Sequence, residues 1–315
     1  MRQNRNDQRA VLRLTKNDKV MKSGHFSNEK SAMKIMIMTD MEGVAGILNF
    51  EDWVFPSGRY YENGKRLLTE EVNAAVDGFF AAGASEVLVV DGHGCGGINP
   101  ELLDERAMLL SGARRPAWPW GLDRSFSGLA FVGQHAKAGT PFSHMTHTQD
   151  FHYVDLSLNG VSIGEYGQLA LCAMELGVPT ILACGEKALA EEASALTPGV
   201  VTVSVKHGLL PDGFDDVDAE TYSRSKLSAV HISPRRARGM IRAGAVEAMR
   251  RLREDPSAFR YPDIRPPYVM QGVLRPSGSN PKRNFRNEHP TSVIAVMNMP
   301  ARCQPVRQPK SRRRC

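Results

Sequence analysis

Short apolar segments alternate along the chain with segments of helical periodicity, and this alternation constrains the fold more than any other feature. Residues 34–39 form an apolar strand, and residues 63–80 repeat apolar side chains at spacings of three and four. Further elements of both kinds follow, with strands over 86–91, 128–133, 179–184 and 200–205 and helices over 165–176 and 234–253. Strands that alternate with helices indicate parallel pairing, so we predict an α/β fold with a mostly parallel central sheet flanked by helices.

Other segments depart from this alternation. A proline opens residues 100–110, which we predict to be helical. Asn159-Gly160 lies between two strand-like segments and is typical of a hairpin with a type I′ turn. Prolines are concentrated in residues 255–267, which indicates a linker. Beyond it, strands over 268–274 and 292–298 predict a smaller C-terminal α+β part.

These patterns divide the chain into four parts: a disordered extension (1–32), an α/β metal-binding domain (33–254), a linker with the smaller C-terminal part (255–300) and a basic disordered tail (301–315). The extension is polar and weakly periodic, so it is either disordered or upstream of a natural start at Met33. A transit peptide is the less favoured alternative, because the extension contains acidic residues. The tail is either a disordered end or an altered natural C-terminus.

The net charge of +6 comes from the two ends of the chain. Residues 1–34 contain nine Lys and Arg against three Asp and Glu, and residues 301–315 contain six against none. The residues between them are therefore net negative, and the total charge does not predict a basic surface on the folded body. We expect no nucleic-acid partner, with contact through the basic tail as the alternative.

The cysteines and the apolar runs bear on the cellular compartment. The five cysteines are scattered without a CxxC pair, which indicates free thiols in a reducing environment. No apolar run approaches the roughly 18 residues of a membrane span, and the N-terminus lacks the apolar stretch of a signal peptide. We therefore expect a cytoplasmic protein without a membrane partner.

Five side chains of the kind that bind metals lie where predicted strands end or where a helix begins: Asp40, Glu42, His93, His135 and Glu165. Ligands of open α/β sheets bind outside the carboxyl ends of the strands, so these side chains are expected to meet. One zinc ion takes three or four protein ligands. Five donors, with one bridging carboxylate, suit two metal ions, and the pattern favours a metallohydrolase.

Four of these five residues also have a simpler interpretation. Asp40 and Glu42 are like charges that repel unless a cation lies between them, but such pairs also cap helices or lie on the surface. Residues 92–97, which include His93, match the G-x-G-x-x-G pattern of dinucleotide binding. The match is weak, because it does not follow the first strand and no acidic residue follows about 20 positions later. Glu165 in a first helical turn is favoured by the helix dipole alone.

Four histidines lie within 18 residues after the strand 128–133, namely His135, His144, His147 and His152. His135 is nearest the strand end and is the expected metal ligand. The others can contact substrate, transfer protons or be solvated, since an imidazole pKa near 6.5 suits proton transfer. Lys206 follows another strand and is either a contact to a substrate carbonyl or carboxylate, or a solvated lysine.

Six short motifs occur in an order that resembles a known family. They are Thr39-Asp40-Met41-Glu42-Gly43, Leu68-Thr69-Glu70-Glu71, Asp91-Gly92-His93, Gly133-Gln134-His135-Ala136, Met145-Thr146-His147-Thr148 and Gly164-Glu165-Tyr166-Gly167. Over residues 33–298 the chain is similar to the zinc-dependent D-aminopeptidases of the dipeptide-transport operon type, the M55 peptidase family. Each motif is short, and their shared order makes the resemblance specific.

The resemblance implies a metal-dependent aminopeptidase that hydrolyses short peptides or amides, including those with N-terminal D-amino acids, with two zinc ions or alternatively manganese or cobalt. It matches Asp40, Glu42, His93, His135 and Glu165 to the metal ligands, with Asp40 as the bridge. It also matches His147 to the catalytic histidine, with His144 as a rival because the loop before His147 is one residue longer. A ring-shaped homo-oligomer is implied as well. The alternatives are another metal-dependent amidohydrolase or phosphoesterase, or a non-enzymatic assembly protein with a vestigial site.

Overall fold

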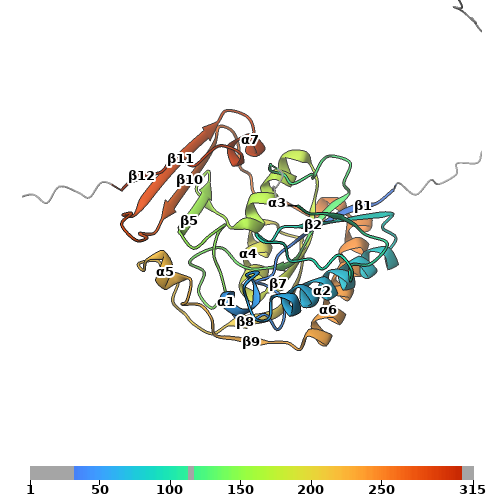
Figure 1. Cartoon of the computed structure of the whole chain (residues 1–315). Coiled ribbons are helices and arrows are strands. Elements are labelled where there is room, and N and C mark those ends of the chain that lie inside the picture. The colour runs from blue at the N-terminus through green and yellow to red at the C-terminus, as the bar shows by residue number, and fades with distance from the viewer. Residues whose placement is uncertain (1–31, 113–116, 307–315) are drawn as a thin grey trace, which may run out of the picture. The chain divides into compact units, whose positions relative to one another are not determined.

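The main sheet is parallel except at one edge. The computed structural model describes residues 32–112 and 117–306. The main sheet in these residues contains β1 (Lys34–Thr39), β2 (Glu86–Asp91), β3 (Met108–Leu110), β4 (Gly128–Gln134), β7 (Thr180–Glu186), β8 (Val201–Gly208) and β9 (Ala229–His231). Their order is β3-β2-β1-β4-β7-β8-β9, and only the pair β8–β9 is antiparallel (Figure 1). The predicted mostly parallel central sheet is confirmed.

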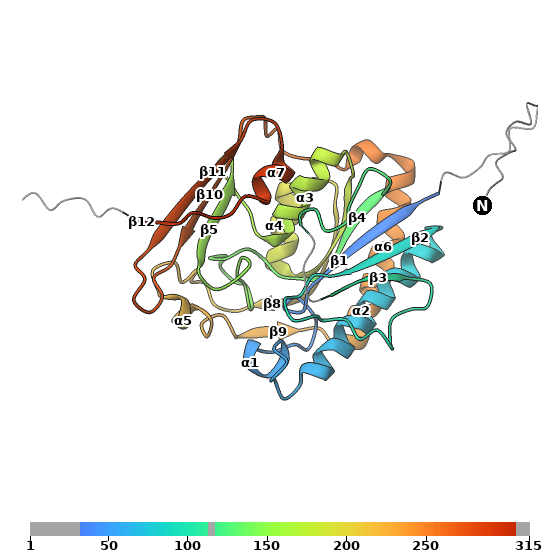
Figure 2. The same ribbon diagram turned by 45° about the horizontal axis from the view of Figure 1, so that its top comes forward.

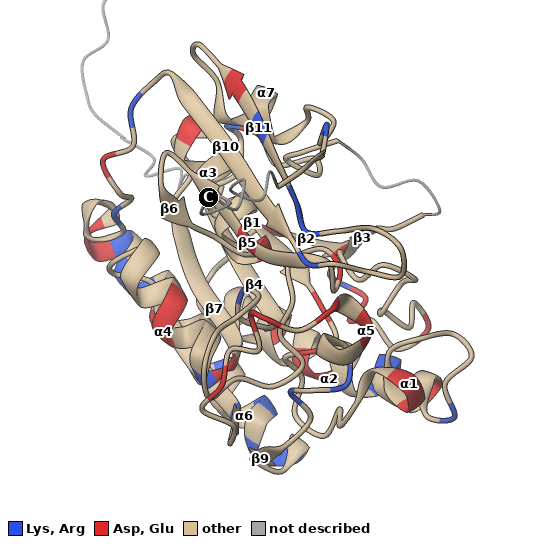
Figure 3. Cartoon of the chain, turned by 90° about the vertical axis from the view of Figure 1, so that its left-hand side faces the viewer, with Lys and Arg blue, Asp and Glu red and all other residues tan. Residues whose placement is uncertain are grey.

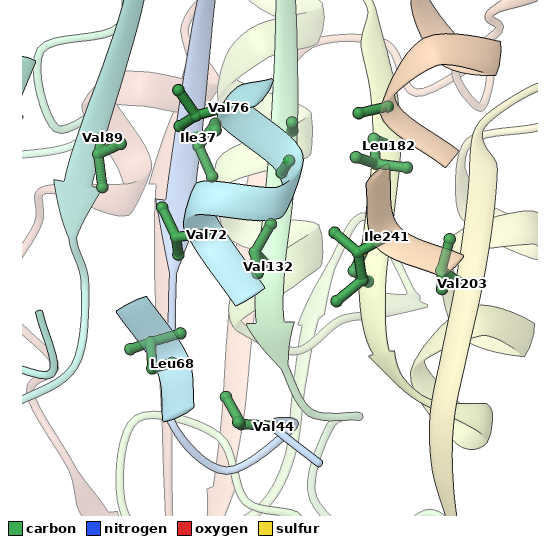
Figure 4. Packing of buried hydrophobic residues seen from close by; sticks show 14 of the residues in the cluster. Ile37, Val44, Leu68, Val72, Val76, Val89, Val132, Leu182, Val203 and Ile241 are labelled. Carbon is green, nitrogen blue, oxygen red and sulfur yellow. The ribbon is translucent and has the colours of Figure 1, made fainter. Parts of the chain in front are cut away.

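Helices cover both faces of this sheet. The long ones are α2 (Tyr61–Ala81), α3 (Glu165–Leu176), α4 (Lys187–Leu196) and α6 (Pro234–Glu254). Helices α2 and α6 pack together on one face, and α3 and α4 lie on the other (Figure 2). Because strand residues alternate between faces, Ile37 joins the core under α2 and α6, whereas Met36 joins the core under α3 and α4. Figure 4 shows Ile37 facing Val72 and Val76 of α2. Three of these helices are predicted above, and α4 is an addition.

The outer faces of the helices are charged. Arg242 of α6 lies 2.6 Å from the carboxylate of Asp77 of α2, and Arg238 pairs with Glu70 in the same way. Figure 3 shows basic residues along α6 and both signs of charge on α4. Within residues 32–112 and 117–306, no helix combines the length and apolar character that a membrane crossing requires.

A second sheet is antiparallel and joins the middle of the chain to its C-terminal part. It contains β5 (Tyr153–Leu158), β6 (Val161–Ser162), β10 (Tyr268–Leu274), β11 (Arg283–His289) and β12 (Gln304–Pro305), in the order β12-β11-β10-β5-β6 (Figure 1). Asn159 and Gly160 connect β5 and β6 with φ values of 48° and 81°. Positive φ at both central residues is what a type I′ turn requires, so the predicted hairpin is confirmed. Short helices also occur at α1 (Phe50–Trp53), α5 (Ala219–Tyr222) and Pro256–Ala258.

The helix predicted over 100–110 is wrong. This segment forms successive turns that lead into β3. The side chain of Asn73 in α2 explains the difference, because it donates to the carbonyl of Leu102 at 2.7 Å and accepts from the backbone N–H of Asp104 at 2.8 Å. Asp104 in turn accepts from the N–H of Arg106. Side chains thus satisfy the backbone groups that a helix would have paired.

The strand predicted over 292–298 is also wrong, because this segment forms helix α7 (Val293–Met297). The Ser292 hydroxyl accepts from the N–H of Ala295, and the carboxylate of Glu175 in α3 accepts from the N–H of Ile294. These are N-terminal capping contacts, and they favour a helix over an extended segment. The strand partner of β10 is instead β11, which is not predicted above. The expected tail from 301 also contains β12, while residues 307–315 and the extension 1–31 lie outside the described residues.

Candidate metal centre

The segment after β1 passes very close to the end of β4, and two glycines permit this. Gly43 donates from its N–H to the carbonyl of Gly133 at 2.7 Å. A Cβ atom at Gly43 would lie 2.0 Å from the carbonyl oxygen of Gln134, and one at Gly133 would lie 2.0 Å from that of Asp40. Gly133 also has a φ of +76°, which favours glycine. The two glycines therefore bring Asp40 and Glu42 next to the end of β4.

One group of ligand atoms comes from Asp40, Glu42 and His93, all of which are buried. The Nδ1 atom of His93 lies 3.2 Å from Oδ1 of Asp40 and 3.3 Å from Oε2 of Glu42. The ring's Nε2 lies 2.8 Å from the carbonyl oxygen of Val54, which fixes its orientation. Burial alone would lower the pKa of His93, but the two carboxylates raise it well above its usual range.

Hydrogen bonds within the glycine-rich turn that carries His93 occupy two of its backbone N–H groups. The carboxylate of Asp91 accepts from the N–H groups of Gly97 and Ile98, at 2.8 and 3.3 Å. Amides that cradle a phosphate must point towards the ligand, whereas these two are paired within the turn. The G-x-G-x-x-G pattern therefore serves here as a turn that presents His93 to the carboxylates.

A second group comes from His135, His147 and Glu165. The Nε2 atoms of the two histidines each lie 3.7 Å from Oε1 of Glu165. Their rings are stacked with centroids 4.2 Å apart. Both rings direct Nδ1 to a backbone carbonyl, His135 to Ala136 at 2.8 Å and His147 to Met145 at 3.1 Å. When Nδ1–H donates in this way, the lone pair of each histidine lies on Nε2, the atom that faces Glu165.

Asp40 lies between the two groups and touches both. Its Oδ1 faces His93 at 3.2 Å, and its Oδ2 faces Nε2 of His135 at 3.2 Å. Burial raises the pKa of Asp40, but the two histidines outweigh it and hold that pKa well below its usual range. This geometry fits the bridging position that the family resemblance implies for Asp40.

The donor set fits divalent metal ions. Within each group, one ligand atom from every residue lies within 4.8 Å of the others. Oε2 of Glu42 and Nε2 of His135 are buried and, despite their close charged neighbours, form no hydrogen bond to any residue that the structure describes. An unpaired buried polar atom is costly unless a bound ligand pairs with it. Imidazole nitrogen and carboxylate oxygen are the usual non-thiol ligands of zinc. All five predicted metal ligands therefore come together, and His147, predicted as catalytic, lies beside Glu165 with them.

The other two predicted residues, His144 and Lys206, lie behind these groups. The ammonium of Lys206 donates to the carbonyls of Glu42 and Ile47, and the side chain is only 2% exposed. Burial lowers the pKa of Lys206 to about 8. The His144 ring faces the carbonyl of Leu48 and is buried, which lowers its pKa to about 2. Neither belongs to a ligand group, and in this arrangement both support the loop after β1 from within the core.

Sequence reasoning missed Glu186 at the end of β7. Its carboxylate accepts from the N–H of Ala136 at 2.8 Å and from the N–H of His144 at 2.6 Å, and the residue is fully buried. It thereby connects the segment that carries His135 to the loop that carries His147. The available signal is an acidic residue that directly follows the apolar run Ile181-Leu182-Ala183-Cys184-Gly185 at the same sheet edge.

Comparison with known proteins gives consistent matches. The family model described as D-aminopeptidase, peptidase M55, matches residues 33–272. A D-aminopeptidase of Bacillus subtilis (strain 168) is 36% identical over 176 residues, which is 55% of this chain and 64% of that protein. The chain thus matches somewhat less than two thirds of that relative. The structure of the Zn-dependent D-aminopeptidase DppA from Bacillus subtilis, a self-compartmentalizing protease, is similar with a TM-score of 0.70 at 25% identity, covering 84% of this chain and 94% of that one.

Proposed function

Because this chain belongs to the D-aminopeptidase family of M55 peptidases, we propose that it is a metal-dependent aminopeptidase. It would hydrolyse short peptides or amides, including those with N-terminal D-amino acids. The observation that carries this proposal is the position of Asp40, whose two oxygens face His93 and His135 in the two ligand groups. We propose two zinc ions, with manganese or cobalt as alternatives, since mixed nitrogen and oxygen ligands bind all three.

The protein side chains have distinct proposed roles. Asp40, Glu42 and His93 would hold one ion, and Asp40, His135 and Glu165 the other. When bound, the ions would act as Lewis acids and polarise the carbonyl of the scissile bond. Gln149 donates its backbone N–H to Oε1 of Glu165 at 2.7 Å and so keeps that carboxylate turned towards the two histidines.

His147 is the proposed general acid. Since its Nδ1 is engaged by the Met145 carbonyl, Nε2 is the atom available to hold a proton and pass it to the leaving amine. Phe50 and Phe151 pack edge-on or tilted against the ring, with centroids 5.6 and 5.4 Å away. These contacts fix the ring at the border of the ligand group, where a proton donor is needed.

Replacing His147 tests this assignment. His147→Ala should retain the wild-type metal content and lose about 10²- to 10⁴-fold in kcat, the usual contribution of a general acid. His135→Ala should lose metal as well. His152→Ala is the matched control in the same loop, because that side chain is half exposed and pairs with Asp150. A fall in metal content for His147→Ala equal to that of His135→Ala would show that His147 is a ligand instead.

Assembly and location are also proposals. The Bacillus subtilis structure is described as self-compartmentalizing, so we propose that this chain forms a homo-oligomer that encloses its sites. We further propose a cytoplasmic location and a division of the chain into an N-terminal extension, a catalytic domain over 33–254, a linker with a smaller C-terminal part that extends through β12, and a basic tail after it.

A further inference from the structure

A narrow pocket adjoins the candidate metal centre on the side of Asp40 and Glu165. Two tryptophans, Trp118 and Trp120, line it together with Met38 and Leu169. Its lining is mixed, because Asp40, Glu165, Thr39, Gln134 and Gln149 line it beside these apolar side chains.

Trp118 and Trp120 form one side of the pocket, which we call the tryptophan wall. The C-terminal part of the chain holds this wall in place. Asn298, at the end of α7, accepts from the N–H of Trp118 and donates to its carbonyl, both at 3.0 Å. The rings of Trp118 and Trp120 meet edge to face, with centroids 5.9 Å apart, and Trp120 is only 6% exposed. The wall is therefore fixed at its backbone and at its rings.

Two of the residues that line the pocket have unusual backbone conformations. Trp120 has a φ of 60° and Gln149 a φ of 63°. Bulky residues rarely adopt this region, and such strained positions concentrate at functional sites. A glycine would suit the positive φ at 120 better, and the buried packing of the Trp120 ring in the core under α3 and α4 holds this conformation in place.

The pocket is small. Its cavity volume is about 20 Å³. One water molecule needs about 10–15 Å³ by this measure, and a methyl group is of similar size. A branched or aromatic side chain would require one of the indole rings to move.

We propose that Trp118 and Trp120 set the size limit on the N-terminal side chain of the substrate and exclude side chains larger than a methyl group. This inference rests on the proposed aminopeptidase function. In an aminopeptidase substrate, the carbon beside the scissile carbonyl carries both the amino group and the first side chain. Because Asp40 and Glu165 both line the pocket, a carbonyl held between the two ligand groups would bring that side chain next to it.

The test compares kcat/KM for the amides of glycine, alanine, leucine and phenylalanine, in whichever stereochemical series the wild type cleaves. Wild type should prefer glycine and alanine. Trp120→Gly removes the ring and suits the positive φ, and Trp118→Ala opens the same wall from a less buried position. Each variant should raise the leucine-to-alanine and phenylalanine-to-alanine ratios by about 10-fold or more, the usual effect of pocket size.

Leu122→Ala is the matched control, because Leu122 is buried in the same loop but does not line the pocket. It should leave the ratios unchanged even if it lowers stability. Unchanged ratios in both tryptophan variants, with wild-type metal content and alanyl activity, would overturn the proposal. So would variants that change only the tolerance for the second residue in alanyl dipeptides. If wild type cleaves none of these amides or dipeptides, it is the proposed function that fails.

Discussion

Replacing Glu186 by glutamine tests whether the two histidine segments depend on one buried carboxylate. Glu186 accepts from the backbone N–H groups of Ala136 and His144, and no part of it is exposed. Glutamine is nearly the same size but has only one acceptor oxygen. Its amide group would face the second N–H, so one buried donor would lose its partner.

The expected loss of stability follows from the number of N–H donors left without a partner. A buried donor left without a partner costs about 1–3 kcal/mol. For a domain of this size, each kcal/mol lowers the melting temperature by about 2–4 °C. Glu186→Gln should therefore lower the melting temperature by about 2–12 °C. Glu186→Ala leaves both donors unpaired and should cost roughly twice as much.

Thermal unfolding of metal-free protein, followed by circular dichroism, measures this loss. Glu191→Gln is the matched control, since that side chain is 69% exposed and its pairing with Lys187 at 3.6 Å is of the weak surface kind. The metal content of each folded variant is measured in parallel. Because Glu186 supports the segments of His135 and His147, we expect its replacement to weaken metal binding. A melting temperature and metal content equal to those of Glu191→Gln would refute this role.

Two further predictions concern the centre itself. Gly43→Ala should reduce metal content although it changes none of the proposed ligands. The added Cβ would lie 2.0 Å from the Gln134 carbonyl oxygen and must displace the loop of Asp40 and Glu42. Wild-type metal content, measured by elemental analysis, would contradict this prediction. Removal of metal by a chelator should lower the melting temperature by about 5–11 °C, since a ligand at 100 times its Kd adds about 2.7 kcal/mol. Zinc should restore the loss, and a melting curve indifferent to both chelator and zinc would argue against a buried metal centre.

The sequence predicts the main sheet well because its strands are short, apolar and separated by helices of clear periodicity. It fails where side chains override local preference. Pro100 suggests the start of a helix, but Asn73 binds the backbone groups of the following turns from a neighbouring helix. Residues 292–298 are apolar enough for a strand, but Ser292 and Glu175 cap a helix there. Both errors arise from contacts between residues distant in sequence, which a local pattern cannot contain.

The same contrast between local pattern and distant contact applies to the candidate site. Asp40, Glu42, His93 and His135 follow strands of one parallel sheet, so the fold itself predicts that they meet. The position of Lys206 beside the carbonyl of Glu42 could not be foreseen, because a lysine after a strand is usually solvated. Glu186 and the two tryptophans were missed for a related reason. Their roles depend on what lies opposite them in space.

Two parts of the chain share the control of this centre. The proposed ligands come from the ends of β1, β2 and β4 and from the start of α3. Close contacts at Gly43 and Gly133 leave little room for change there. The tryptophan wall is instead tied to Asn298 at the end of α7. Helix α7 is itself anchored by Glu175, which is on α3 only ten residues after Glu165. A change at Asn298 should therefore move the pocket wall while the sheet keeps the proposed ligands in place. If the proposed function holds, substrate selection would then vary independently of metal binding.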